Sequence, residues 1–167
     1  MLIFIYKKEE ILMKNNELVA LLIDKKIKIS CAESCTGGML ASKIVEVADA
    51  SKVLDVSFVT YADCAKVDLL GVNQTTIDKY GVVSEEVAKE MAMGVAQVAK
   101  SDVGLSVTGL AGPTGGTFEK PVGMVCFGIY VNKEIYAYTC QFGNIGRTNV
   151  REASVEFIIN KLIEILS

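Results

Sequence analysis

Strand-like and helix-like segments alternate along most of this chain, and that order limits the possible fold more than any other feature. Apolar or β-branched residues predict strands at residues 27–30, 53–61 and 103–108, with helix-patterned segments between them. A helix between two strands of one sheet acts as a crossover and makes those strands parallel. We therefore expect three parallel strands, with helices on both faces of the sheet.

The last third of the chain departs from this alternation. Residues 122–131 and 135–142 have strand character and are separated only by Asn132-Lys133, a spacing typical of a hairpin. A hairpin adds an antiparallel strand to the sheet. With no internal repeat and no credible linker, the sequence predicts one domain over residues 1–167. Its expected class is α/β, with a mixed, mostly parallel sheet.

Helices are expected on either side of the strands. Amphipathic spacing predicts them at residues 9–25 and 39–47, and a closing helix from about Thr148 to the carboxyl end. Three further helices have side chains suited to capping their first turns. These side chains are Asp63, Thr75 with Asp78, and Ser84.

The chain contains no histidine, and this absence narrows its chemistry. It excludes a Ser-His-Asp triad, a Cys-His dyad and a histidine-ligated metal site. The five cysteines are odd in number, irregularly spaced and without a CxxC pair. We therefore expect neither a zinc site nor a disulfide framework, and interpret them as reduced thiols in a cytoplasmic protein. No metal and no cofactor are predicted.

Charge and hydropathy argue against nucleic-acid and membrane partners. Seventeen basic and twenty acidic residues give a net charge of -3, with no basic cluster longer than Lys25-Lys26, whereas nucleic-acid-binding domains usually have a basic face. The apolar segment Leu2–Tyr6 is only five residues long. A signal peptide needs about 7–15 apolar residues, and a membrane span about 20.

Two glycine-rich loops follow predicted strands. Gly37-Gly38 lies after the first, and half of the fourteen glycines fall between Gly104 and Gly128. Ligands of open α/β sheets bind outside the carboxyl ends of strands, so both loops are expected to face one pocket; glycines serving only tight turns are an equally good alternative. The loop at 109–116 matches neither GxGxxG nor GxxxxGK[ST], which argues against a dinucleotide or nucleoside-triphosphate site.

Ser34 is the candidate nucleophile, because free backbone N–H groups at the start of the following helix can stabilise an oxyanion. The alternative is an ordinary helix cap. Without histidine, a serine needs another base, and a lysine with a lowered pKa can serve. Lys66 is the candidate, with Tyr61 as a hydrogen-bonding partner, although a solvated lysine and a core tyrosine are the alternatives. Cys35 lacks its usual activator and is expected to be a packed thiol.

Short motifs follow one another in a characteristic order along nearly the whole chain. They are Ala-Glu-Ser-Cys-Thr-Gly-Gly (32–38), Val-Thr-Tyr (59–61) with Ala-Lys (65–66), Leu-Gly-Val (70–72), Gly-Val-Val-Ser (81–84), Ser-Val-Thr-Gly (106–109), Ala-Gly-Pro (111–113), Gly-Gly (115–116) and Lys-Pro-Val-Gly (120–123). This set resembles the C-terminal domain of the competence/damage-inducible protein CinA, a family that includes stand-alone nicotinamide-nucleotide amidohydrolases. Residues 1–15 match poorly and are interpreted as an N-terminal extension.

The resemblance implies a three-layer α/β/α fold and deamidation of nicotinamide mononucleotide to nicotinate mononucleotide and ammonia, in pyridine-nucleotide salvage. It also implies a serine–lysine mechanism with a supporting tyrosine, which by motif position are Ser34, Lys66 and Tyr61. The protein is expected to form a homo-oligomer, a dimer or larger. The residues expected to bind the substrate are Cys35, Thr36, Gly37, Gly38, Thr108, Gly109 and Arg147.

The segment before the last helix departs from the family pattern. Members commonly have Gly-Asp-Arg there, whereas residues 143–147 are Gly-Asn-Ile-Gly-Arg. Arg147, with Arg151, is nevertheless the best candidate for binding the substrate phosphate. Family proteins often carry an N-terminal domain resembling molybdopterin-binding enzymes, which a chain of this length is expected to lack.

A second class of function stays open at this point. CinA domains are associated with competence and DNA damage, so the chain is alternatively a non-catalytic binding or interaction module. The joint presence of Ser34, Tyr61 and Lys66 favours the enzyme, because a binding module has no need of all three.

Overall fold

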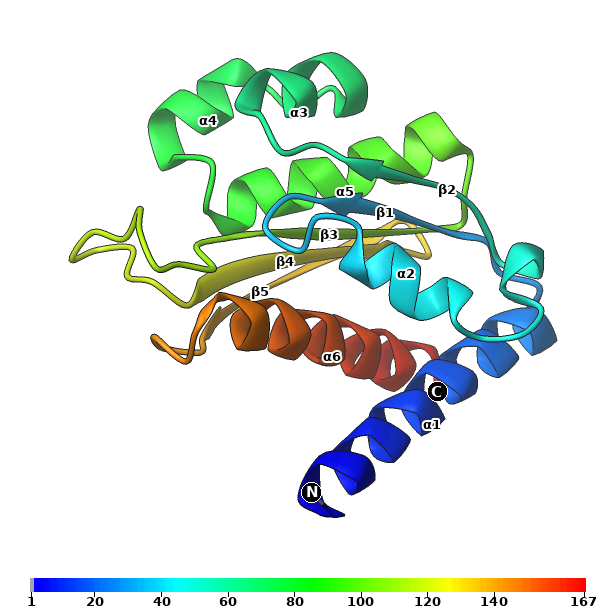
Figure 1. Cartoon of the computed structure of the whole chain (residues 1–167). Coiled ribbons are helices and arrows are strands. Elements are labelled where there is room, and N and C mark those ends of the chain that lie inside the picture. The colour runs from blue at the N-terminus through cyan, green and yellow to red at the C-terminus, as the bar shows by residue number, and fades with distance from the viewer. Residues whose placement is uncertain (1) are drawn as a thin grey trace.

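Five strands form one mixed sheet at the centre of the molecule (Figure 1). The structure is a computed structural model that describes residues 2–167, with side chains from Leu12 onward. The strand order across the sheet is β2-β1-β3-β4-β5. The strands are β1 (Ile29–Glu33), β2 (Leu54–Val59), β3 (Val103–Gly109), β4 (Met124–Val131) and β5 (Glu134–Gln141).

The predicted mixed sheet is confirmed: only β4 runs against the direction of the other four strands. Strand β1 pairs in parallel with β2 and β3, whereas the β3–β4 and β4–β5 pairs are antiparallel. The reason is that residues 110–123, between β3 and β4, contain no helix, so the chain returns beside β3 in the opposite direction. The predicted hairpin turn is present: Asn132 and Lys133 have positive φ of 52° and 66°, as a tight two-residue turn requires.

Helices flank the sheet on both sides. Figure 1 shows α3, α4 and α5 on one side, and α1, α2 and α6 on the other. Because the sheet is covered in this way, β1 is buried along its whole length and β3 along all but its last residue. The helices are α1 (Leu2–Lys25), α2 (Met39–Val45), α3 (Asp63–Leu70), α4 (Gln74–Tyr80), α5 (Glu85–Ala99) and α6 (Arg147–Leu166), with a short 3-10 helix at Ala50–Lys52.

Of the three predicted caps, one is confirmed and two are wrong. The Ser84 hydroxyl accepts a hydrogen bond from the Val87 N–H, at 3.3 Å, and caps α5. Asp63 lies inside the first turn of α3 and does not cap it. Helix α4 begins before Thr75, so its cap is Asn73, whose side chain accepts the Thr75 N–H at 3.0 Å.

The central strand β1 positions the site. It continues to Glu33, three residues beyond its predicted end, and all five of its residues are buried. In the register of the sheet, Glu33 is opposite Val59 of β2 and Val107 of β3. The carboxyl ends of the three parallel strands therefore meet at one edge, where ligands of α/β sheets bind.

Candidate active site

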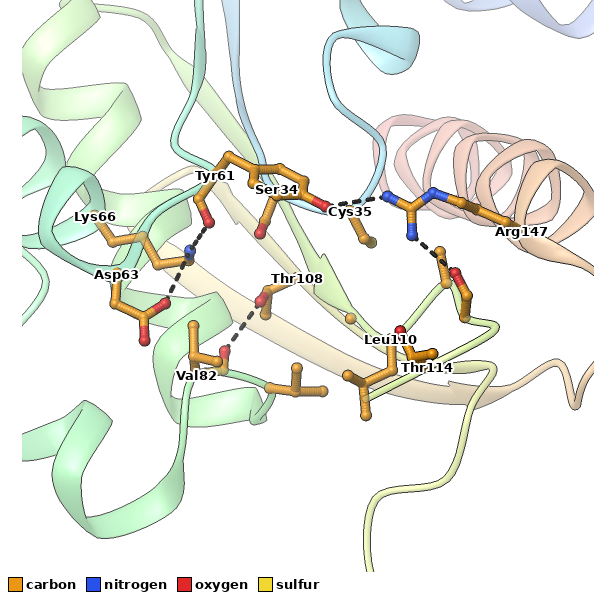
Figure 2. A pocket seen from close by; sticks show the side chains of 14 residues that line it. Ser34, Cys35, Tyr61, Asp63, Lys66, Val82, Thr108, Leu110, Thr114 and Arg147 are labelled. Atoms are coloured by element: carbon orange, nitrogen blue, oxygen red, sulfur yellow. Dashed lines mark hydrogen bonds and ion pairs between the residues drawn. The ribbon is translucent and has the colours of Figure 1, made fainter. Parts of the chain in front are cut away.

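A pocket of about 270 Å³ opens at this edge of the sheet (Figure 2). Its walls come from the turn after β1, the β2–α3 connection, the segment before α5, the loop after β3 and the start of α6. Seven of the ten residues predicted for the site line it together. They are Ser34, Cys35, Tyr61, Lys66, Thr108, Gly109 and Arg147.

The other three predicted residues, Thr36, Gly37 and Gly38, do not line the pocket. Thr36 is fully buried. Gly37 and Gly38 have φ of 58° and 92°, a left-handed conformation that glycine adopts without strain. These glycines therefore serve the sharp turn from β1 into α2, which is the alternative to close ligand approach.

Ser34 is the first residue after β1. Its N–H donates to the Val107 carbonyl of β3 at 2.9 Å, which fixes its backbone to the central sheet. Its side chain lines the pocket (Figure 2), and its Oγ forms no hydrogen bond with any residue that the structure describes. The hydroxyl is therefore available to a ligand.

Lys66 is completely buried, which contradicts the solvated alternative. Its Nζ donates to the Thr60 carbonyl at 2.9 Å, with the Tyr61 and Ala62 carbonyls at 3.5 Å. The Asp63 carboxylate lies 3.7 Å away. Burial lowers the pKa of Lys66, and the negative charge of Asp63 acts in the opposite direction. The site thus favours the neutral amine more than water does.

Arg147 and Tyr61 meet across the mouth of the pocket. Tyr61 is 61% exposed, so it is not the core aromatic of the alternative interpretation. The Arg147 guanidinium donates to the Tyr61 hydroxyl at 3.0 Å and to the Gly112 carbonyl at 2.9 Å (Figure 2). Arg151, one helical turn later, donates to the Thr36 carbonyl at 2.7 Å. Both arginines therefore contact the protein's own groups around the site.

Glu33 is a buried residue of the site region that the sequence did not single out. Its carboxylate accepts the N–H groups of Gly38 (3.0 Å), Leu40 (3.0 Å) and Ala41 (2.9 Å) at the start of α2. The expectation that this helix start offers free N–H groups is therefore wrong from Gly38 onward. The only signal in the sequence is an acidic residue directly before the turn.

Two other pocket residues are held in place by the protein. Cys35 is buried, as expected for a packed thiol, and burial raises its pKa to about 12. The Thr108 hydroxyl donates to the Val82 carbonyl at 3.0 Å. The Cys35 N–H has no backbone acceptor among the described residues, and Cys35 lines the pocket, so this N–H is available to an anionic oxygen there.

Membrane-spanning helices and metal-binding clusters are both absent from the described residues, which are 2–167 for the backbone and 12–167 for side chains. No helix in this range is long and apolar enough to cross a membrane. Nor do these residues contain a cluster of three or more Cys, Asp or Glu side chains arranged to hold a metal ion.

Comparison with known proteins gives the same family from sequence and from structure. Residues 12–166 match the CinA C-terminal domain. A CinA-like protein of Kosmotoga olearia is 50% identical over 145 residues, which are 86% of this chain and 35% of that protein. The chain spans about a third of the length of the curated relatives that it matches.

Solved structures agree along most of the chain. The competence/damage inducible protein CihA of Agrobacterium tumefaciens is 36% identical, with a TM-score of 0.91 over 94% of this chain and 96% of that one. A CinA superfamily protein of Escherichia coli is 35% identical, with a TM-score of 0.85 over 91% and 90% of the two chains. This chain belongs to the CinA C-terminal domain family.

Proposed function

We propose that this protein is an amidohydrolase that converts nicotinamide mononucleotide to nicotinate mononucleotide and ammonia, in pyridine-nucleotide salvage in the cytoplasm. The observation that carries the proposal is the pairing of two groups in one pocket. Lys66 is buried with a lowered pKa, and the Ser34 hydroxyl lacks a hydrogen-bond partner among the described residues. A base and a nucleophile of this kind are what acyl transfer without histidine requires.

In the first step, Ser34 Oγ attacks the carboxamide carbon and Lys66 accepts its proton. The resulting ammonium is stabilised by the Thr60 carbonyl and by the nearby carboxylate of Asp63. No hydrogen bond joins Ser34 Oγ to Lys66 Nζ among the described contacts. Such contacts often shorten only when a substrate is bound.

The tetrahedral oxyanion would be stabilised by the free N–H group of Cys35. Collapse of this intermediate breaks the C–N bond, and Lys66 returns its proton to the departing amine, which leaves as ammonia. A water then attacks the acyl-enzyme ester as Lys66 takes its proton. Finally Lys66 gives that proton back to Ser34 Oγ, which restores the enzyme and releases the carboxylate product.

The remaining walls suit a mononucleotide. Val82, Val83 and Leu110 offer apolar surface for the pyridine ring, and Tyr61 offers a hydroxyl at the mouth. The substrate phosphate cannot use the start of α2, because the Glu33 carboxylate occupies it. We therefore assign the phosphate to Arg147 and the loop after β3.

Ammonia release from a panel of compounds tests this proposal. The panel contains nicotinamide mononucleotide, nicotinamide riboside, nicotinamide and simple amides, and the acid product is identified by chromatography. Wild-type protein should release ammonia fastest from the mononucleotide, and Ser34→Ala should not. Full activity of Ser34→Ala would contradict the mechanism, and wild-type protein that acts on none of the amides would favour the binding module.

A further inference from the structure

We propose that Glu33 is a positioning residue that holds the catalytic turn, residues 34–38, in its active geometry by anchoring the start of α2. The inference rests on the proposed function, because it assigns Glu33 an effect on the rate of the Ser34 reaction. Glu33 does not line the pocket. Glu33 must therefore affect the reaction through the backbone of residues 34–38, whose position it holds.

The carboxylate of Glu33 replaces the cap that α2 lacks. The residue before this helix is Gly38, which has no side chain to cap it. The first N–H groups of a helix have no acceptor within the helix. Glu33 Oε2 accepts those of Gly38 and Leu40, and Oε1 accepts that of Ala41.

Each end of the catalytic turn is thereby tied to the same rigid strand. Glu33 is the last residue of β1, paired on both sides with neighbouring strands. Its backbone begins the turn and its side chain holds the turn's far end. Helix α2 has only seven residues, which is too short to be stable without tertiary contacts. The position of the turn therefore depends on this carboxylate.

Two other contacts fix the middle of the turn. The Ser34 N–H donates to the Val107 carbonyl at 2.9 Å, and Arg151 donates to the Thr36 carbonyl at 2.7 Å. With Glu33, these contacts set the direction of Ser34 Oγ relative to the free N–H group of Cys35. The contribution of Glu33 is geometric, since a negative charge near a developing oxyanion gives it no electrostatic stabilisation.

The variant Glu33→Gln tests this role with little change in shape. Glutamine offers one acceptor oxygen where Glu33 uses two, so at least one of the three hydrogen bonds is lost. We expect kcat to fall roughly tenfold to a hundredfold, with KM for nicotinamide mononucleotide little changed, because small misplacements of reacting groups are costly.

A matched control is available at the start of α4. Glu90 accepts the Asn73 N–H at 2.7 Å and the Thr76 hydroxyl at 2.6 Å, and it does not line the pocket. Glu90→Gln should keep a wild-type kcat. Equal kcat for the two variants would overturn the proposal. So would a loss in Glu33→Gln that the unfolded fraction at the assay temperature, measured by thermal denaturation, fully explains.

Hydrogen exchange of the wild-type protein tests the anchor without any variant, and so decides the matter if Glu33→Gln does not fold. The N–H groups of Gly38, Leu40 and Ala41 should exchange about as slowly as those of β3, because their acceptor is buried. Rapid exchange there would overturn the proposal. Wild-type protein that releases no ammonia would instead refute the proposed function, so the two failures are distinguishable.

Discussion

Arg147 donates a 3.0 Å hydrogen bond to the Tyr61 hydroxyl, which connects the first residue of α6 to the β2–α3 segment that carries Lys66. The same guanidinium also donates to the Gly112 carbonyl of the loop after β3. The Arg147 side chain therefore joins three walls of the pocket: the start of α6, the β2–α3 connection and the loop after β3. An anionic ligand that binds Arg147 must compete with these contacts.

Replacing Arg147 tests the phosphate assignment. A charge-assisted hydrogen bond contributes about 1.5–3 kcal/mol, so Arg147→Ala should lower kcat/KM for nicotinamide mononucleotide roughly tenfold to a hundredfold or more. The loss should be small for nicotinamide riboside, which has no phosphate. Tyr61→Phe, which removes only the hydroxyl partner, serves as the control for the lost Arg147–Tyr61 contact. Equal losses for both substrates would refute the assignment.

The fall in activity at low pH should follow the protonation of Lys66; we call this part of the rate–pH curve its acid limb. Only the neutral amine accepts a proton, so activity should rise as pH increases through the pKa of Lys66, and burial places this pKa below the ordinary value of about 10.4. Lys66→Arg should be inactive, because a guanidinium stays protonated near neutral pH. Substantial turnover by this variant would show that Lys66 acts only as a cation.

Asp63 should shift that limb through its negative charge, without exchanging a proton with the substrate. Its carboxylate is 3.7 Å from Lys66 Nζ and raises the pKa of the amine. Asp63→Asn should therefore move the acid limb of kcat toward lower pH, while the plateau rate changes little. A pH titration of single-turnover rates measures the shift, and movement toward higher pH would contradict this electrostatic account.

Cys35 should be chemically inert although it lies next to the nucleophile. Its pKa of about 12 keeps it protonated at neutral pH, and the thiolate is the reactive form. Iodoacetamide should modify the exposed Cys64 and leave Cys35 unmodified, as peptide mass spectrometry can show. Cys35→Ala should retain most of the activity, in contrast to Ser34→Ala. Rapid alkylation of Cys35 would argue for a cysteine nucleophile.

The sequence predicted the parts of the fold that depend on local pattern. Apolar periodicity located the strands and most helices, and Ser84 was identified as a cap from its position alone. The antiparallel pairing of β4 with β5 follows from the two-residue turn between them, whereas the pairing of β4 with β3 depends on a glycine-rich connection with no helical or strand pattern.

In the site, too, local motifs are predictable from the sequence, whereas contacts between distant segments are not. Motif position selected Ser34, Tyr61 and Lys66, which line one pocket, but their catalytic roles stay a prediction. The role of Glu33 is not predictable from the sequence, because an acidic residue is normally assumed to be solvated, and only the fold shows that it is buried against helix N–H groups. Likewise, the partners of Arg147 come from segments distant in the sequence.

The proposed nucleophile follows a central strand of the sheet, whereas the proposed base lies in α3, the helix that follows an edge strand. Ser34 follows β1, which has a neighbour on each side, whereas Lys66 follows β2, which lies at the edge of the sheet and is largely uncovered. Edge elements open at lower free energy than central ones. Mild denaturant should therefore separate the base from the nucleophile before the protein unfolds as a whole, so that inactivation precedes the loss of global secondary structure.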